Sequence, residues 1–167
     1  TFQILEGWYY SKDKNCVYFK SQRIEWADPQ TFQILEYSYS KDENFVYDDW
    51  LKIEWADPQT FQILEYWNYS KDKNFVYIAH QSVMGSDMIY MTSQRIVWSD
   101  PQTFQVLKHW YAKDKNFVYL FTRDRFYKIK WADPQTFQVL ENWYYSKDKN
   151  SVYKYNDKID WADPKTF

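Results

Sequence analysis

Short runs of alternating polar and apolar residues recur along this chain at nearly regular intervals. In the first copy, residues 17–19 and 23–26 form two such runs on either side of a short polar tip. Both runs are rich in β-branched and aromatic residues, which are typical of strands whose side chains point alternately to two faces. The pattern predicts a β-hairpin in each copy.

The phrase Thr-Phe-Gln-(Ile/Val)-Leu marks the start of each copy. It begins at Thr1, Thr31, Thr60, Thr103 and Thr136, and Thr166 opens it once more. Self-similarity at a period near thirty residues indicates a repeat protein. We predict repeats at 1–30, 31–59, 60–102, 103–135 and 136–165, with residues 166–167 starting a sixth.

Two further segments complete each repeat. The first contains Asp-Pro ahead of the Thr-Phe phrase, where Asp is a good helix N-cap and Pro suits the first helical position. We therefore expect one or two helical turns, capped by Asp28, Asp57, Asp100, Asp133 and Asp163. The second segment, Tyr-Ser-Lys-Asp-Lys-Asn in residues 10–15, predicts a turn because Asp and Asn bond to nearby backbone.

These elements predict a mainly β fold of tandem β-hairpin repeats with short Asp-Pro-capped helical turns. We expect the repeats to stack as a solenoid or superhelix, because each unit buries its apolar side chains against its neighbours. A closed five-repeat toroid or propeller-like ring is the alternative. It ranks second because thirty residues are few for a four-stranded propeller blade.

Two repeats carry insertions, and both fall at the hairpin tip. The step from the Tyr of the first arm to the Ile of the second is six residues in repeats one, two and five, nineteen in repeat three and ten in repeat four. Insertions in repeat proteins lie on one face, often the binding face. Met84, Met88 and Tyr90 in the long insertion are therefore candidate binding residues, although a purely structural hairpin fits equally well.

Aromatic residues make up 23% of the chain, and ten of them are tryptophans. Most of these rings must belong to the core, because a fully exposed set would form a large apolar patch. Exposed rings would instead offer stacking platforms for carbohydrate. The candidates for such a site are the series Trp26, Trp55, Trp98, Trp131 and Trp161, and a second group is Trp8, Trp67, Trp110 and Trp143.

The turn and the Asp-Pro segment together resemble the DKNYY family of bacterial repeat proteins. Residues 113–119 and 132–137 carry the resemblance best. It implies a bacterial repeat domain of the cell envelope or the extracellular space, with no catalytic residue to transfer. The family pattern commonly has Gly before Ala-Asp-Pro, whereas this chain has Trp at all five positions. Those rings must either join a ladder between repeats or meet something outside.

The remaining chemistry points to a binding or structural protein without catalytic residues. His80 and His109 occupy unmatched places, and neither forms part of a recognisable catalytic spacing. We expect no metal site and no cofactor, because lysines flank the Asp of the turn, as Lys12 and Lys14 flank Asp13, and Cys16 is the only cysteine. With 21 basic and 23 acidic residues, the charge balance also argues against a nucleic-acid partner. No apolar stretch is long enough for a membrane span.

We therefore expect a non-catalytic structural protein of a bacterial surface or extracellular assembly. The first and last repeats lack polar caps, so self-association through the repeat ends, as in a head-to-tail filament, is the expected mode. The alternative function is a cell-envelope module that binds a carbohydrate or a protein.

Overall fold

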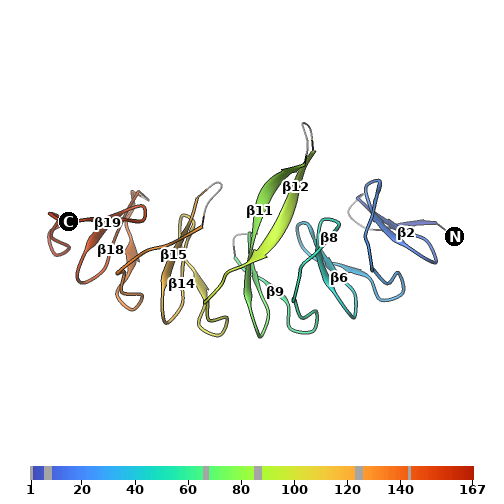
Figure 1. Cartoon of the computed structure of the whole chain (residues 1–167), viewed down its shortest axis with the longest axis horizontal. Helices are drawn as coiled ribbons and strands as arrows, with labels where there is room; N and C mark the ends of the chain where they lie inside the picture. Colours follow the sequence, from blue (N-terminus) through green and yellow to red (C-terminus); the bar gives the residue numbers. More distant parts are fainter. Residues whose placement is uncertain (1, 6–8, 66–67, 85–87, 123–125, 143) are drawn as a thin grey trace. The chain divides into compact units, whose positions relative to one another are not determined.

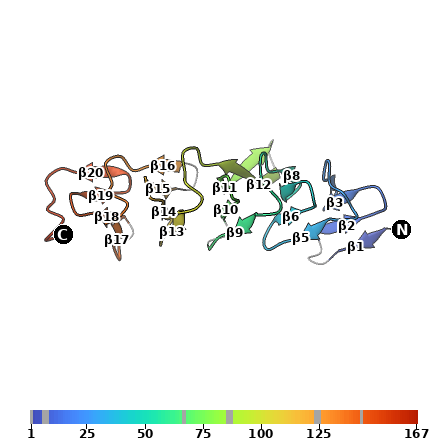
Figure 2. The same cartoon turned by 90° about the horizontal axis from the view of Figure 1, so that it is seen from below.

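The chain consists of strands and turns, and the strands form five four-stranded antiparallel sheets (Figure 1). The structure is a computed structural model that describes residues 2–5, 9–65, 68–84, 88–122, 126–142 and 144–167, with the backbone alone at 80–84 and 88–92. Each sheet lies within one predicted repeat, and its strands follow one another in chain order, as β17 to β20 do in Figure 2. A mainly β repeat fold is thus confirmed.

All five sheets share one plan, in which a short first strand precedes a central pair and an edge strand closes the sheet. The first sheet comprises β1 (Gln3–Ile4), β2 (Tyr10–Lys12), β3 (Val17–Phe19) and β4 (Gln22–Arg23). The second comprises β5 (Gln33–Ile34), β6 (Tyr39–Lys41), β7 (Val46–Asp48) and β8 (Leu51–Lys52). The third comprises β9 (Gln62–Ile63), β10 (Tyr69–Lys71), β11 (Val76–Met84) and β12 (Met88–Arg95). The fourth comprises β13 (Gln105–Val106), β14 (Tyr111–Lys113), β15 (Val118–Phe121) and β16 (Phe126–Lys128). The fifth comprises β17 (Gln138–Val139), β18 (Tyr145–Lys147), β19 (Val152–Lys154) and β20 (Asp157–Ile159).

The predicted helical turns are not confirmed, since the described residues contain no helix. After the Asp-Pro step the chain makes a single turn, closed by a 3.2 Å hydrogen bond from the Thr60 amide to the Asp57 carbonyl. The following residues then extend as the first strand of the sheet, in which Gln62 pairs with Lys71 and Ile63 with Ser70. A strand ladder satisfies the backbone groups that a second helical turn would have used.

The insertions of repeats three and four lie at the hairpin tips, as predicted. In repeat three, β11 and β12 pair in an unbroken register from Tyr77 opposite Arg95 to Met84 opposite Met88. They form the long green hairpin of Figure 1. In repeat four, the longer tip joins Phe121 to Phe126, which are partners in the β15–β16 pair.

The chain divides into two compact units, residues 1–96 and 97–167. Within the first, the Tyr10 ring of repeat one packs against Phe32 of repeat two at a centroid distance of 5.7 Å, and Phe32 packs against Tyr47 at 6.2 Å. Within the second, Tyr111, Phe137 and Tyr153 repeat this arrangement at 5.7 and 6.2 Å. The core of each unit therefore consists of aromatic rings that pack against rings of the neighbouring repeat.

A buried aspartate holds the turn of each repeat after the first. The Asp72 side chain accepts hydrogen bonds from the Asn74 and Phe75 amides at 2.6 and 2.7 Å and from the Tyr77 hydroxyl at 2.8 Å. It also accepts the Asp57 amide, from the turn that precedes it, at 2.8 Å. Four donors offset the cost of burying the carboxylate. Its equivalents are Asp42, Asp114 and Asp148, which are likewise buried.

Candidate functional site

The tryptophan that precedes each Ala-Asp-Pro or Ser-Asp-Pro segment is the most exposed large apolar side chain among the described residues of its repeat. The five indoles are between 73% and 86% exposed, from Trp55 at the low end to Trp161 at the high end. Other exposed apolar side chains occur in the described part, such as Tyr37 at 64%, whereas central-strand tyrosines such as Tyr39 and Tyr77 are fully buried. Packing of the fold therefore does not account for this series, and the prediction that most rings are core fails for it.

Four of these tryptophans also have a backbone conformation that is unfavourable for a bulky residue. Trp26, Trp55, Trp98 and Trp131 each have a φ of 70°. In the first two repeats the turn is closed by the amide of the next residue, as from Ala56 to the Ile53 carbonyl at 3.3 Å. The tryptophan is the third residue of that turn, where a positive φ normally selects Gly or Asn. A left-handed conformation costs a residue with a Cβ about 1–2 kcal/mol.

The indoles also stand apart from one another. Ring contacts in the described part of the chain do involve other tryptophans, since Trp50 stacks on Phe19 at 6.0 Å and Trp110 lies 6.1 Å from Phe121. None of these ring contacts includes a member of the exposed series. Within each unit these rings therefore form no ladder among the described residues, and they are exposed.

A basic residue lies three positions before each exposed tryptophan, which the sequence analysis overlooked. The five are Arg23, Lys52, Arg95, Lys128 and Lys158. Three of them extend over a phenylalanine ring of the same repeat: Lys52 lies 4.8 Å from the centroid of Phe45, Arg95 4.6 Å from that of Phe75 and Lys128 3.4 Å from that of Phe117. The recurrence of this residue in all five copies is the signal that could have revealed it. Each repeat thus carries an exposed indole and, three positions earlier in the sequence, a basic side chain.

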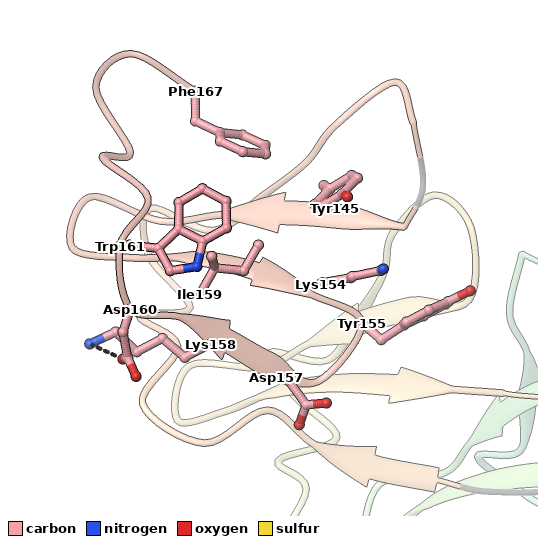
Figure 3. Close-up of a pocket in the computed structure, with 9 residues that line it drawn as sticks. All are labelled: Tyr145, Lys154, Tyr155, Asp157, Lys158, Ile159, Asp160, Trp161 and Phe167. Carbon is pink, nitrogen blue, oxygen red and sulfur yellow. Dashed lines mark ion pairs between the residues drawn. The ribbon is translucent and has the colours of Figure 1, made fainter.

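In the last repeat these groups line a cavity. It measures about 680 Å³, and Figure 3 shows the Trp161 indole between the side chains of Phe167 and Ile159. Tyr145, Tyr155 and the charged side chains of Lys154, Asp157, Lys158 and Asp160 complete the lining. Lys158 and Asp160 form an ion pair at 3.7 Å. The volume lies in the range of small-molecule sites, which combine apolar walls with a few polar groups.

The other candidate binding residues belong to a different part of the repeat. Met84 pairs with Met88, and Tyr90 with Ser82, at the outer end of the β11–β12 hairpin. Their side chains lie outside the described residues. Of the second tryptophan group, Trp8, Trp67 and Trp143 lie outside the described residues, and Trp110 is half exposed.

The Asp-Pro aspartates hold their turn and tie it to the next repeat. Asp57 accepts the Gln59 amide at 2.9 Å and the Thr60 hydroxyl at 3.2 Å, and Asp28, Asp100 and Asp133 make the same two bonds. Asp163 accepts the Lys165 amide at 2.9 Å. The Lys73 ammonium, 2.6 Å from Asp57, and the Gln59 amide lower the pKa of the Asp57 carboxyl. These bonds place the aspartates in a structural role.

Other kinds of site find little support in the described residues. No group of three or more His, Cys, Asp or Glu side chains is placed there to hold a metal ion. The Cys16 thiol is free and half-buried. No helix long and apolar enough to cross a membrane occurs in this part of the chain.

Comparison with known proteins gives the chain a family. No curated protein and no solved structure matches it. The model of the DKNYY family matches residues 10–54 and 121–167, which together make up more than half of the chain. Both stretches contain the Asp-Lys turn or the Asp-Pro segment that the repeats share, and the chain belongs to the DKNYY family.

Proposed function

We propose that this chain is a non-catalytic repeat module that binds a linear polysaccharide of a bacterial cell envelope or extracellular matrix. The observation that carries the proposal is the series of exposed indoles, one in each of five repeats, four of them at a positive φ. Residues that cost the fold free energy and add nothing to its core are typical of functional positions. One exposed indole in each repeat suits a polymeric ligand that is built from repeating sugar units.

The spacing of the rings favours carbohydrate over a protein partner. A protein interface buries a contiguous apolar centre surrounded by a polar rim. Here each indole is separate from the others and is preceded by charged side chains, such as Lys52 and Glu54 before Trp55. A sugar ring presents an apolar C–H face to an indole and hydroxyls to neighbouring charged groups. The cavity beside Trp161 combines the same two kinds of group.

A structural role in a head-to-tail assembly is the second candidate. The Tyr10 side chain of repeat one reaches repeat two, where its hydroxyl donates a hydrogen bond to the Ser38 carbonyl at 2.9 Å. This contact between neighbouring repeats favours stacking as a solenoid. The position of Lys154 disfavours docking of a second copy on the end face of the last repeat. It occupies the place of Phe19, Asp48 and Leu120, which are buried. A second copy docked there would have to desolvate its ammonium, so we rank binding first.

Affinity electrophoresis of the 167-residue chain tests the proposal. The gels would contain hydroxyethyl cellulose, glycol chitin or a soluble mannan as the linear polysaccharide. We expect retardation by at least one of these, and loss of retardation when Ala replaces all five exposed tryptophans. Val97→Ala is the matched control, because Val97 is an exposed apolar residue next to Trp98. Unchanged mobility of the wild type in every gel, or equal retardation of the five-fold variant, would refute carbohydrate binding.

A further inference from the structure

One sheet of this chain ends on an edge strand far longer than the others. The edge strands β4 and β8 have two residues each and β16 and β20 have three, whereas β12 has eight. Very short edge strands are one way in which proteins prevent pairing with other chains. Repeat three departs from this arrangement.

The outer part of the hairpin has no neighbouring strand among the described residues. β10 pairs with β11 only at Val76, Tyr77 and Ile78, and the bond from the Ala79 amide to the Asn68 carbonyl is the last one. At its base, β12 is tied to the second sheet, where the Ser93 hydroxyl donates to Asp48 at 2.7 Å. From there to the tip, neither strand pairs with any other described strand along its outer edge.

The hydrogen-bond register identifies the backbone groups on these edges. The Ile96 amide donates to the Val76 carbonyl, so residues of even number in β12 face β11. The Ala79 bond to Asn68 agrees with this, because it places the odd residues of β11 on the opposite side. The amide and carbonyl of Ile89 and of Met91 therefore point away from the hairpin. Two-stranded ribbons are only marginally stable in water, so a further strand would stabilise this one.

Nothing in the sequence of the ribbon opposes such pairing. Between Ala79 and Ser93 only His80 and Asp87 can carry charge near neutral pH, and there is no proline. The shorter tip of repeat four instead contains Arg123, Asp124 and Arg125. Lysine, proline and inward charges are the usual protection of an exposed edge.

We infer that β12 is an interaction surface and that its partner is β12 of a second copy of this chain. An antiparallel pair formed by one strand with itself is self-complementary about a twofold axis. With that axis at Tyr90, Ile89 of each copy lies opposite Met91 of the other, and each such pair exchanges two backbone hydrogen bonds. Because the strand from Met88 to Thr92 is uncharged, two copies meet there without like-charge repulsion.

Sedimentation velocity over a concentration series tests this inference. We expect the wild type to change from a 20.8 kDa monomer to a dimer as its concentration rises. Met91→Pro removes an outward amide and leaves the β11–β12 ladder intact, so it weakens dimerisation at least tenfold. Met91→Ala keeps the amide and dimerises within about threefold of the wild type.

A shortened hairpin keeps the test decisive if the proline variant fails to fold. His80 and Thr92 form a hydrogen-bonded pair, so Asn-Gly in place of residues 81–91 closes the hairpin with a two-residue turn. This variant should remain monomeric and keep its polysaccharide binding, which does not depend on the ribbon. A wild type that stays monomeric at several hundred micromolar would overturn the inference. Dimerisation that survives in the shortened variant would overturn it as well.

Discussion

At the scale of single residues, the exposed tryptophans and the buried aspartates make opposite contributions to the free energy of folding. Trp55 pays the cost of a left-handed backbone and stays in solvent, whereas Asp72 is buried and receives four hydrogen bonds. Replacing Trp55 should therefore leave the stability of the fold unchanged or raise it. Replacing Asp72 should lower it.

Trp55→Gly should stabilise the protein and weaken carbohydrate binding. Glycine adopts a positive φ without steric cost, and after allowing for its greater freedom in the unfolded chain we expect a gain of about 1 kcal/mol. Trp55→Ala retains a Cβ and should give no such gain. Urea denaturation measures both, with Trp161→Gly as the control, because Trp161 is not among the residues with positive φ. Equal effects of glycine at positions 55 and 161 would contradict the strain argument.

Asp72→Ala should destabilise the protein by about 3 kcal/mol or more, because it leaves the buried Tyr77 hydroxyl and three partly buried amides without an acceptor. Asp13→Ala is the matched control from the first repeat. Asp13 accepts the Asn15 and Cys16 amides and the Tyr18 hydroxyl, but it is only half-buried and no preceding turn donates to it. Its removal should cost clearly less in the same urea denaturation experiment. A larger loss at Asp13 than at Asp72 would contradict the role of burial.

At the scale of elements, the ion pair between consecutive turns is present at three junctions and missing at one. Lys73, Lys115 and Lys149 lie 2.6, 2.7 and 2.8 Å from Asp57, Asp100 and Asp133. The junction of repeats one and two has Glu43 at the lysine position, with its amide 3.4 Å from the Thr31 hydroxyl. The first junction therefore has acidic residues, Asp28 and Glu43, at the two positions that carry an Asp and a Lys at the other junctions.

Glu43→Lys should raise the melting temperature by restoring this ion pair with Asp28. The gain should be small, because the equivalent lysines are more than 60% exposed, and it should shrink at 1 M NaCl, where screening is strong. Calorimetry at low and high salt measures it. Glu43→Gln separates removal of the repulsion from creation of the pair. A gain that does not depend on salt would exclude the electrostatic explanation.

The tyrosine–aspartate pairs between the turn and the third strand predict a loss of stability at alkaline pH. Burial and the hydrogen bond to Asp72 raise the pKa of Tyr77 above its ordinary value, and Tyr47 and Tyr119 are affected in the same way. The unfolded chain ionises these phenols near pH 10 while the folded chain keeps them protonated. Unfolding therefore becomes easier as the pH rises above about 10, and the tyrosines stabilise the fold fully only below it.

Denaturant titrations between pH 8 and 11.5 in 1 M NaCl measure this effect, since salt suppresses the contribution of the lysine pairs. Absorbance at 295 nm should show a group of tyrosines that ionises only as the protein unfolds. A free energy of unfolding that stays constant over this range would contradict the prediction.

The hairpins could be predicted from the sequence, whereas the first strand of each sheet could not. Residues 17–19 and their equivalents alternate locally, and a hairpin needs no distant partner. Asp-Pro, in contrast, caps a helix and opens a turn equally well, and Phe32 and Leu35 also have helical spacing. Gln33 and Ile34 become a strand because β6, which follows them, offers a free edge. Pairing of this kind is tertiary information that a local pattern lacks.

The exposure of the tryptophans was equally hidden from composition. The argument that most aromatic rings belong to the core holds for Tyr39, Tyr77 and Phe104, which are buried. It fails for Trp26 and its four equivalents, which are exposed and of which four have a positive φ at the turn. The one indication of this exposure was that Trp stands in this sequence where the family pattern has glycine.

At the scale of the whole molecule, the repeats give the proposed site several equivalent contacts. Unit one contains Trp26 and Trp55, and unit two contains Trp98, Trp131 and Trp161. Tethered weak contacts act together on a polymer, because once one has formed the others form at a high effective concentration. A short oligosaccharide that reaches only one indole gains nothing from the rest.

Affinity should therefore depend on ligand length as well as on the number of tryptophans. Removing one indole should weaken binding to the long polysaccharide about tenfold, which corresponds to roughly 1.4 kcal/mol, and each further removal should weaken it again. Binding to a disaccharide of the same sugar should be weak in the wild type and change little in any single variant. Affinity electrophoresis and calorimetry with size-fractionated ligand measure both trends. Loss of all polymer binding on replacement of one tryptophan would instead indicate a single site, and the variant that causes the loss would locate it.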